Sequence, residues 1–383
     1  LLEAVARDDQ AAIRAHAWSL FARLTAPSSE IYQGTVLPIW ETWYSGAELY
    51  DDGTRACLGL QTRPFRRDFE SPAQHLHAHQ QSGNPAVSEE LVTSFNRFDQ
   101  EVVDHVCARR YNSAQRLNEI NAGFAPSTPV VDRSIEPFEP AGVALKPVFW
   151  IVPQKGVTIF PYWAGSGPEA TTDPTNPTPD TWRQCVAVVP PGTDAPAPPF
   201  TGSCNGEQVT IAQVIGLDRF YHFALTAGDI ENASTFGFLD GAPPEPGDYA
   251  LFVAMHVTSK EIPQWTWQSF WWTPTPDASP DGADRPESVR DEWRNYAMCA
   301  AYQMMQPEGD PNGKPVVCFN PYLETGLTGI DGVQSNCMTC HRLAAWPNFS
   351  TNYQANGLVL PGDAALFGDD LKLDFLWSIT RAM

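Results

Sequence analysis

VALKPVFWIV, residues 143–152, is a run of β-branched and aromatic side chains that begins after Gly142 and ends before Pro153. Side chains of these types favour extended strands. Similar short runs follow, and clusters of Gly, Pro, Asn and Asp separate them: VTIFPYW (157–163), CVAVV (185–189), VTIAQVI (209–215), FYHFAL (220–225) and DYALFVAMHV (248–257). Short strands divided by turn residues predict an antiparallel, β-rich unit in the middle of the chain.

Helices are predicted on both sides of this unit. In residues 9–25 the apolar side chains recur at helical spacing, Asp9 can cap the N-terminus and Pro27 follows the end. Residues 88–110 also place apolar side chains at intervals of three and four. Further helices are expected at residues 289–305 and around the cysteine motif described below. The predicted fold class is therefore α+β.

These patterns divide the chain of 383 residues into three regions. Residues 1–125 form a mainly helical N-terminal region, and residues 126–275 form the antiparallel β-rich region. Residues 276–383 form a loop-rich, partly helical C-terminal region. A chain of this length can build two or three core-forming units or one elaborated domain.

The composition excludes some classes of function. The net charge is −21, from 45 acidic and 24 basic residues, and such a surface repels the backbone of a nucleic acid. An acidic surface serves solubility, and it can also attract a basic partner protein. The chain has no run of about 18 apolar residues, so no membrane-spanning segment is expected.

The most informative motif is SNCMTCHRLAAWPN, residues 335–348. Cys337 and Cys340 are separated by two residues, and His341 follows directly. On a helix this spacing puts both sulfurs on one face, within reach of the two vinyl groups at one haem edge, and the imidazole can then bind the iron. The pattern is that of c-type haem attachment. The expected cofactor is one covalent haem c, with His341 as the proximal iron ligand.

Three other interpretations of the motif remain open. A thioredoxin-like dithiol would lie in an alternating β/α pattern, which does not surround residue 337. A structural zinc site needs two further ligands at suitable spacing, and the chain has no second Cys-x-x-Cys. The third interpretation is two unrelated disulfide cysteines beside a histidine. The motif favours haem over all three.

Through Cys337, Cys340 and His341 the chain resembles the c-type cytochromes over about a dozen residues. Three longer segments are similar to a group of large, uncharacterised bacterial monohaem cytochrome c-type proteins: LKPVFW (145–150), HVTSKEIPQWTWQSFWW (256–272) and LKLDFLWSI (371–379). This second resemblance covers most of residues 130–383. It implies the cofactor and brings no particular activity with it.

The other six cysteines are an even number and predict disulfides. The pairs with short loops are Cys185–Cys204, which flanks a proline-rich hairpin, and Cys299–Cys318, which brackets a Gly/Pro loop. Cys57–Cys107 is the remaining pair. Disulfides persist in oxidising compartments, where cytochrome c maturation also takes place in bacteria. The protein is therefore expected in the periplasm or outside the cell, with its export signal removed.

The sixth iron ligand bears directly on function. In small electron-carrying cytochromes c it is usually a methionine downstream of the motif, but only Met383 lies beyond His341 here. His256, at the end of DYALFVAMHV, is the leading candidate for the distal ligand. Its neighbour Met255 must point to the opposite face of the strand. The alternatives lie on the predicted helix 289–305: Met298, Met304 and Met305.

Two further clusters invite a functional interpretation. His75, His77 and His79 could share one face of a strand and bind copper or zinc, although a polar His-rich loop is the simpler interpretation. The four tryptophans between residues 265 and 272 could relay electrons from a haem. Large aromatic side chains are more often core anchors, so we expect them in the core.

Three functions fit these features, and the third is a binding or structural module in which the haem serves as a sensor or a conductive element. The first is electron transfer to or from a redox partner protein, alone or as a subunit of a larger redox assembly. The second is a haem oxidoreductase that acts on a small molecule at an open iron face, with His256 or a tyrosine as acid or base. Patterns of a catalytic triad, a phosphate loop or a flavin fingerprint are absent. Electron transfer ranks first because it needs only the cofactor already inferred.

Overall fold

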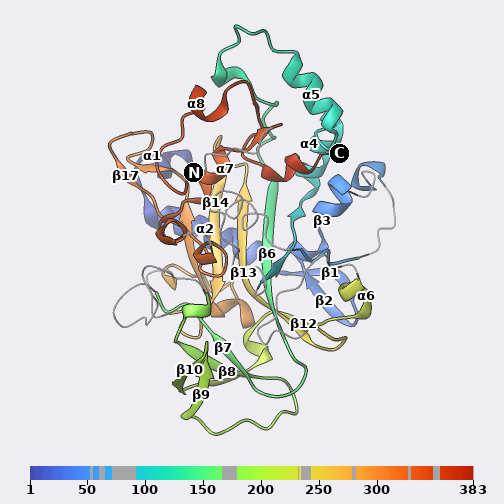
Figure 1. Ribbon diagram of the computed structural model, residues 1–383, viewed down its shortest axis with the longest axis vertical. Helices are drawn as coiled ribbons and strands as arrows, with labels where there is room; N and C mark the ends of the chain where they lie inside the picture. The colour runs from blue at the N-terminus through green and yellow to red at the C-terminus, as the bar shows by residue number, and fades with distance from the viewer. Residues whose placement is uncertain are drawn as a thin grey trace.

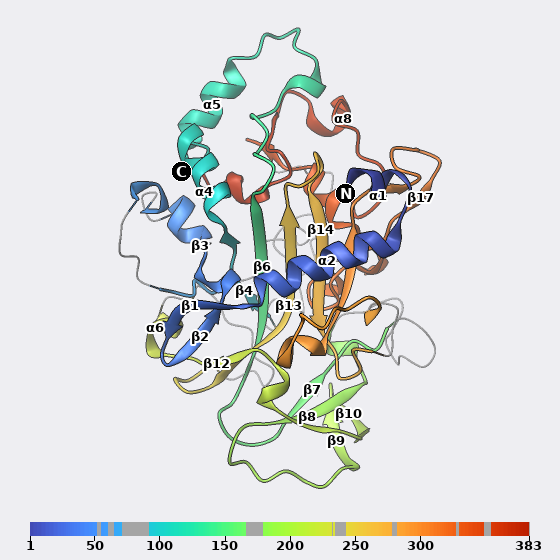
Figure 2. The same cartoon turned by 180° about the vertical axis from the view of Figure 1, so that it is seen from behind.

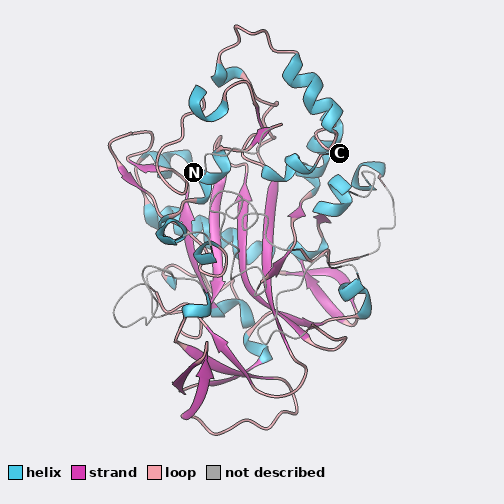
Figure 3. Ribbon diagram, in the orientation of Figure 1, coloured by secondary structure: helices cyan, strands magenta, loops and turns pink. Residues whose placement is uncertain are grey.

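The computed structural model describes residues 1–51, 55–59, 65–70, 92–165, 179–231, 233, 243–277, 282–326, 329–347 and 354–382. The predicted metal-binding loop with His75, His77 and His79 lies outside the described residues, as does Met383. Helices lie mainly at the periphery and strands in the middle (Figure 3). The fold is α+β, as predicted.

The α-helices of the described residues are short apart from α2. Their bounds are α1 (Leu2–Ala6), α2 (Gln10–Leu24), α4 (Gln100–Arg109), α5 (Ala114–Ala122), α6 (Ala227–Glu231), α7 (Cys337–Arg342) and α8 (Ala364–Phe367). Helix α2 confirms the prediction for residues 9–25. The side chain of Asp9 caps it by accepting a hydrogen bond from the backbone N–H of Ala12, at 3.0 Å.

One eight-stranded sheet, whose neighbouring strands all run antiparallel, forms the centre of the molecule (Figure 1). Its order is β15-β14-β13-β6-β5-β3, with β4 also paired to β6 and β12 to β13. The bounds are β3 (Tyr44–Ser45), β4 (Thr93–Ser94), β5 (Arg97–Phe98), β6 (Val143–Val152), β12 (His222–Ala224), β13 (Tyr249–Ser259), β14 (Thr266–Trp272) and β15 (Tyr296–Ala301). Strands of all three predicted regions therefore share one sheet.

Smaller sheets surround the large one. Strands β7, β8 and β11 form a three-stranded sheet at one end of the molecule, in which β8 and β11 run parallel and so depart locally from the predicted antiparallel pattern. Four two-stranded units complete the list. The bounds are β1 (Pro27–Tyr32), β2 (Thr35–Pro38), β7 (Thr158–Pro161), β8 (Cys185–Val189), β9 (Phe200–Cys204), β10 (Glu207–Ile211), β11 (Val214–Gly216), β16 (Met305–Gln306), β17 (Lys314–Pro315), β18 (Ala345–Trp346) and β19 (Leu371–Lys372).

The two faces of the large sheet carry different parts of the chain. Helix α2 crosses one face (Figure 2), where Phe21 stacks on Phe270 with ring centroids 4.1 Å apart. Met255 and Met298 are the register partners of Phe270, so they point to this face as well. The opposite face presents His256, whose register partners are Lys146 and Ser269. The C-terminal segment with α7 packs near one end of the long strands (Figure 1).

The predicted helix 88–110 is wrong over part of its length, and its residues 88–91 lie outside the described residues. Within residues 88–110, Thr93–Ser94 and Arg97–Phe98 are the short strands β4 and β5, and the helix begins only at Gln100. Both strands pair with β6, where the buried Phe95 and Phe98 join the core. The apolar spacing therefore reflects sheet packing before residue 99 and helix packing after it.

The predicted helix 289–305 is also incorrect. A 3-10 turn at Asp291–Asn295 leads into strand β15, and β16 includes Met305. Strand β15 pairs with β14 along its whole length, and a disulfide holds Cys299 to Cys318. Sheet pairing overrides the local helical preference of YAMCAAYQMM, because each residue gains both ladder hydrogen bonds and core contacts.

Asp99 makes the stability of the fold depend on pH. It caps α4, and its two carboxylate oxygens accept from the N–H groups of Val102 and Val143, at 2.9 and 2.8 Å. Burial raises the pKa of Asp99 to about 7. Because the folded state then binds the proton more tightly, its stabilising contribution is complete below a pH of about 4 and is lost as the pH rises through about 7.

We therefore expect Asp99→Asn to remove part of the pH dependence of unfolding. Between a pH of about 4.5 and 7.5 the wild-type chain should lose a few kcal/mol more than the variant, because about 1.4 kcal/mol corresponds to each pKa unit. Urea unfolding at several pH values measures this difference. Parallel curves for the two proteins would show that Asp99 keeps an ordinary pKa in the fold.

Candidate functional site

Helix α7 carries the cysteine motif and is fixed at its N-terminus by Asn336. The buried Asn336 side-chain oxygen accepts from the N–H groups of Met338 and Thr339, at 2.8 and 3.4 Å. Its amide nitrogen donates to the carbonyl oxygens of Gln303 and Val316, at 3.1 and 3.0 Å. The predicted helix is confirmed. Asn336 connects its N-terminus to the backbone near β15 and β17.

Cys337 and Cys340 do not form a disulfide with each other or with another cysteine, although only two residues separate them. Both are half-buried. Burial is the main reason that the pKa of the Cys337 thiol lies well above its usual value. Redox-active dithiols instead stabilise a thiolate with a lowered pKa. A raised pKa of Cys337 is opposite in direction to the pKa shift of a thioredoxin-type nucleophile.

His341 presents one defined nitrogen for ligation. Its Nδ1 lies 2.8 Å from the carbonyl oxygen of Phe375, which can only accept, so Nδ1 carries the hydrogen and Nε2 keeps the lone pair. Burial lowers the pKa of His341 to about 3, and the charge of Lys146 acts in the same direction. The imidazole is thus neutral at physiological pH. A neutral ring with its other N–H on a backbone carbonyl is the usual state of an iron- or zinc-ligating histidine.

The carbonyl that orients His341 is held by an unusual backbone. Asp374 and Phe375 both have a left-handed conformation, with φ of 46° and 71°. Such a conformation costs about 1–3 kcal/mol for each residue that is not glycine. The Asp374 carboxylate anchors it by accepting from Lys260 Nζ at 2.7 and 2.8 Å and from the N–H of Phe138 at 2.9 Å. This anchor positions the Phe375 carbonyl at Nδ1 of His341.

His256 lies beside the motif although the two are far apart in sequence. Its Nδ1 is 4.0 Å from the sulfur of Cys337, and its Nε2 is 2.9 Å from the carboxylate of Glu324. Lys146, its register partner on β6, points to the same sheet face. Burial lowers the pKa of Lys146, and the carboxylates of Glu70 and Glu324 oppose this. The motif therefore lies beside a polar cluster of His256, Glu324 and Lys146, on the face of β6 and β13 opposite α2.

Trp267 completes the surroundings of His341. The two rings pack with centroids 4.1 Å apart and an angle of 37° between their planes. Trp265 and Trp267 belong to the core beneath the C-terminal segment, whereas Trp271 and Trp272 belong to the core on the larger part of the sheet. All four are buried, as expected for core anchors, and Trp267 alone among them contacts the motif histidine by ring packing.

The structure separates the methionine candidates for a distal ligand. Met255 and Met298 point to the face covered by α2, away from His256. Met304 and Met305 are buried in the same core as Trp267 and Met338. Of the predicted methionine candidates, Met304 and Met305 therefore share a core with the motif. Among the predicted distal ligands, His256 contacts the motif directly.

The residues present fit a c-type haem by their donor chemistry. Two cysteines that form no disulfide lie three positions apart on one short helix, and the histidine that follows offers Nε2. Within the described ranges, no group of three or more His, Cys, Asp or Glu side chains has the arrangement of a metal-ion site.

The three predicted disulfides are confirmed. Cys57–Cys107, Cys185–Cys204 and Cys299–Cys318 are bonded, with Cα atoms 5.3, 6.3 and 5.5 Å apart. Disulfides of this number indicate an oxidising compartment. The part of the chain that the structure describes contains no helix with the length and apolar character needed to cross a bilayer.

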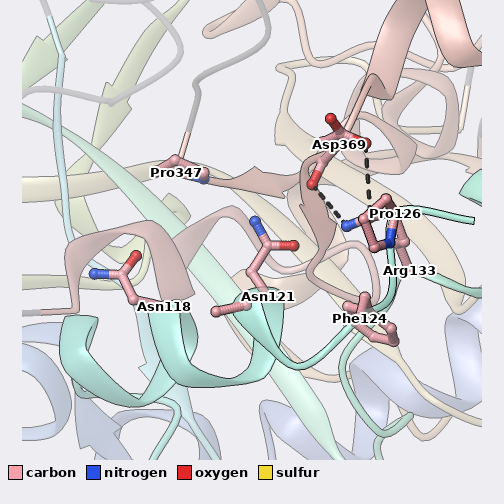
Figure 4. Close-up of a pocket in the computed structure, with 8 residues that line it drawn as sticks. Asn118, Asn121, Phe124, Pro126, Arg133, Pro347 and Asp369 are labelled. Carbon is pink, nitrogen blue, oxygen red and sulfur yellow. Dashed lines mark hydrogen bonds and ion pairs between the residues drawn. The ribbon is translucent and has the colours of Figure 1, made fainter. Parts of the chain in front are cut away.

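A separate pocket of about 390 Å³ lies between α5 and the C-terminal segment (Figure 4). The buried Arg133 lies at one side, with Nη2 3.5 Å from the carboxylate of Asp369. The indole N–H of Trp346 donates to the Asn118 side chain at 2.9 Å and so ties the segment after α7 to α5. The lining is Asn118, Asn121, Ala122, Phe124, Pro126, Arg133, Pro347 and Asp369. It contains none of the predicted site residues.

Comparison with known protein families, with curated proteins and with solved structures finds no match. The resemblance to the c-type cytochromes thus rests on the motif residues themselves. The sequence analysis did not identify Glu324, Lys146 or the Phe375 carbonyl as parts of this site. In the sequence, Glu324 is a single carboxylate within FNPYLETG (319–326), and Lys146 is a single lysine within VALKPVFWIV. Only the fold brings them close to the motif.

Proposed function

We propose that this protein is an exported c-type cytochrome that carries one covalent haem and transfers electrons to or from a redox partner. Cys337 and Cys340 form the two thioether bonds, and His341 provides the proximal ligand through Nε2. When bound, the haem supplies a one-electron couple whose potential depends on its ligands and on its burial. The periplasm or the cell exterior is the proposed location.

The observation that carries this proposal is the difference in bonding between the two motif cysteines and the other six cysteines. Six cysteines are paired in disulfides, whereas Cys337 and Cys340 lie on one helix, three positions apart, and form no disulfide. The hydrogen bond from His341 to Phe375 leaves the nitrogen that a proximal ligand uses. A dithiol enzyme would need neither the neutral histidine nor its backbone anchor.

The partner is proposed to be a basic redox protein or a basic subunit of a larger assembly. The chain has a net charge of −21, which attracts positively charged surfaces over about 8–10 Å in physiological salt. Association with such a partner should weaken as the ionic strength rises. Stopped-flow electron transfer at several salt concentrations measures this dependence.

A second candidate function is a haem oxidoreductase. It is favoured by three ionisable side chains beside the motif, namely His256, Glu324 and Lys146. Such groups could serve a substrate at an open iron face. Binding of carbon monoxide or cyanide without loss of a protein ligand would favour the enzyme, and a six-coordinate iron that resists both would favour the carrier.

His256 is the proposed distal ligand, and His256→Ala is expected to convert a low-spin, six-coordinate haem into a high-spin one. Its imidazole lies next to Cys337. Optical and electron paramagnetic resonance spectra of the purified variant measure the spin state. His222→Ala is a matched control, because His222 lies on β12 of the same sheet. An unchanged spectrum in the His256 variant would remove this residue from the coordination sphere.

A further inference from the structure

Glu324 occupies a position that no sequence pattern assigned, and it contacts His256 directly. Glu324 begins a 3-10 turn (Glu324–Gly326) that packs against the sheet face of His256. Its Oε1 lies 2.9 Å from Nε2 of His256, and both side chains are largely buried, with exposures of 10% and 18%. A carboxylate can only accept here, so Nε2 of His256 carries the hydrogen.

A chain of hydrogen bonds through Asn320 ties this carboxylate to strand β14. The second oxygen, Oε2, accepts from the N–H of Asn320 at 2.5 Å. The Asn320 side chain in turn donates to Oγ of Ser269 and to the carbonyl of Phe270, at 2.8 and 3.1 Å. Ser269 is the register partner of His256 across β13 and β14. The carboxylate is therefore held from two neighbouring strands, by His256 on β13 and through Asn320 by Ser269 and Phe270 on β14, which restricts its position.

The consequence for His256 is a fixed tautomer and a fixed ring direction. With the hydrogen on Nε2, the lone pair of the neutral ring lies on Nδ1. That nitrogen is the one that faces Cys337, at 4.0 Å from its sulfur. Partners that hold the far nitrogen of a ligating histidine typically account for about 10- to 100-fold in metal affinity.

We infer that Glu324 is the positioning residue that directs Nδ1 of His256, rather than Nε2, toward the haem. This inference rests on the proposed function, since it concerns the distal side of the same cofactor. Glu324 itself touches neither thioether nor iron in this assignment. It acts through the imidazole, which it orients and polarises.

Two substitutions test the inference at the same position. Glu324→Ala removes the acceptor, and the ratio of high-spin to low-spin iron should rise by about 10- to 100-fold. Glu324→Gln keeps a side chain of the same shape with a neutral oxygen that can accept from Nε2, but its NH2 group then faces the N–H of Asn320, so it should restore only part of the low-spin signal. Glu261→Ala is the matched control, because Glu261 pairs with His16 in a second carboxylate–histidine contact, at 2.5 Å.

The readouts separate this inference from the proposed function. Intact mass of each variant reports whether the haem is attached, and the electron paramagnetic resonance spectrum reports its ligation. A wild-type protein without haem would overturn the proposed function. If haem is attached and His256→Ala changes the spin state while Glu324→Ala does not, the inference about Glu324 is wrong. A loss of thermal stability in Glu324→Ala with an unaltered spectrum would likewise assign Glu324 a purely structural role.

Discussion

Alanine at both Cys337 and Cys340 is expected to abolish covalent haem attachment completely. The two thioether bonds are the covalent links between haem and chain in the proposed site, and His341 alone would bind the iron reversibly. A single substitution should leave one thioether and therefore a haem that survives denaturation. Intact mass and haem staining after denaturing electrophoresis measure attachment in each variant.

Met338→Leu is the matched control for the cysteine substitutions. Met338 lies between the two cysteines on α7 and is buried, so its replacement disturbs the same helix without removing a thiol. The exchange of methionine for leucine usually costs less than about 1.5 kcal/mol. Covalent haem in the double cysteine variant would contradict the assigned attachment site. Loss of haem in the Met338 variant would show that attachment is sensitive to helix packing alone.

Alanine at both Cys57 and Cys107 is expected to lower the free energy of unfolding by about 4 kcal/mol. This disulfide spans 50 residues and joins the 3-10 turn at Arg55–Leu58 to α4. The bond restricts the unfolded chain, and the restriction increases with loop length. A loss of this size is a large fraction of the stability of an ordinary domain.

Urea unfolding of the oxidised proteins measures the loss. The double variant at Cys185 and Cys204 is the comparison, because that disulfide spans 19 residues and its loop contribution is about 3 kcal/mol. A loss below about 1 kcal/mol for the Cys57 and Cys107 variant would contradict the chain-restriction argument.

The elements that could be predicted are those set by local pattern. Strands β6 and β8 have the bounds of the runs VALKPVFWIV and CVAVV, and α2 follows its apolar spacing and its Asp9 cap. The three disulfides also followed from loop length and an even count. In each case the information lies in a short stretch or in a simple constraint on pairing.

The elements that could not be predicted depend on partners distant in sequence. YAMCAA (296–301) becomes strand β15 because it pairs with β14, and nothing within residues 289–305 indicates this pairing. The predicted helix 88–110 is divided between sheet and helix at Asp99. The carboxylate of this residue accepts hydrogen bonds from both α4 and β6. Apolar spacing alone does not distinguish these outcomes.

The candidate site shows the same division. The cofactor chemistry of Cys337, Cys340 and His341 is local, and α7 provides the helix that their spacing requires. The partners of His341 and His256 come from Phe375 and Glu324, which are 34 and 68 residues away in the chain. The left-handed backbone at Asp374 and Phe375 positions the carbonyl that binds His341, and the sheet register positions His256. Neither feature can be recognised from the sequence.

Intact mass spectrometry of the exported native protein, without reduction and with its visible spectrum recorded on the same sample, is the most direct measurement. The account predicts one haem added to the polypeptide and retained on denaturation, three disulfides, and a red protein with c-type absorption. A colourless protein with the mass of the bare chain, or one in which Cys337 and Cys340 are bonded to each other, would contradict it.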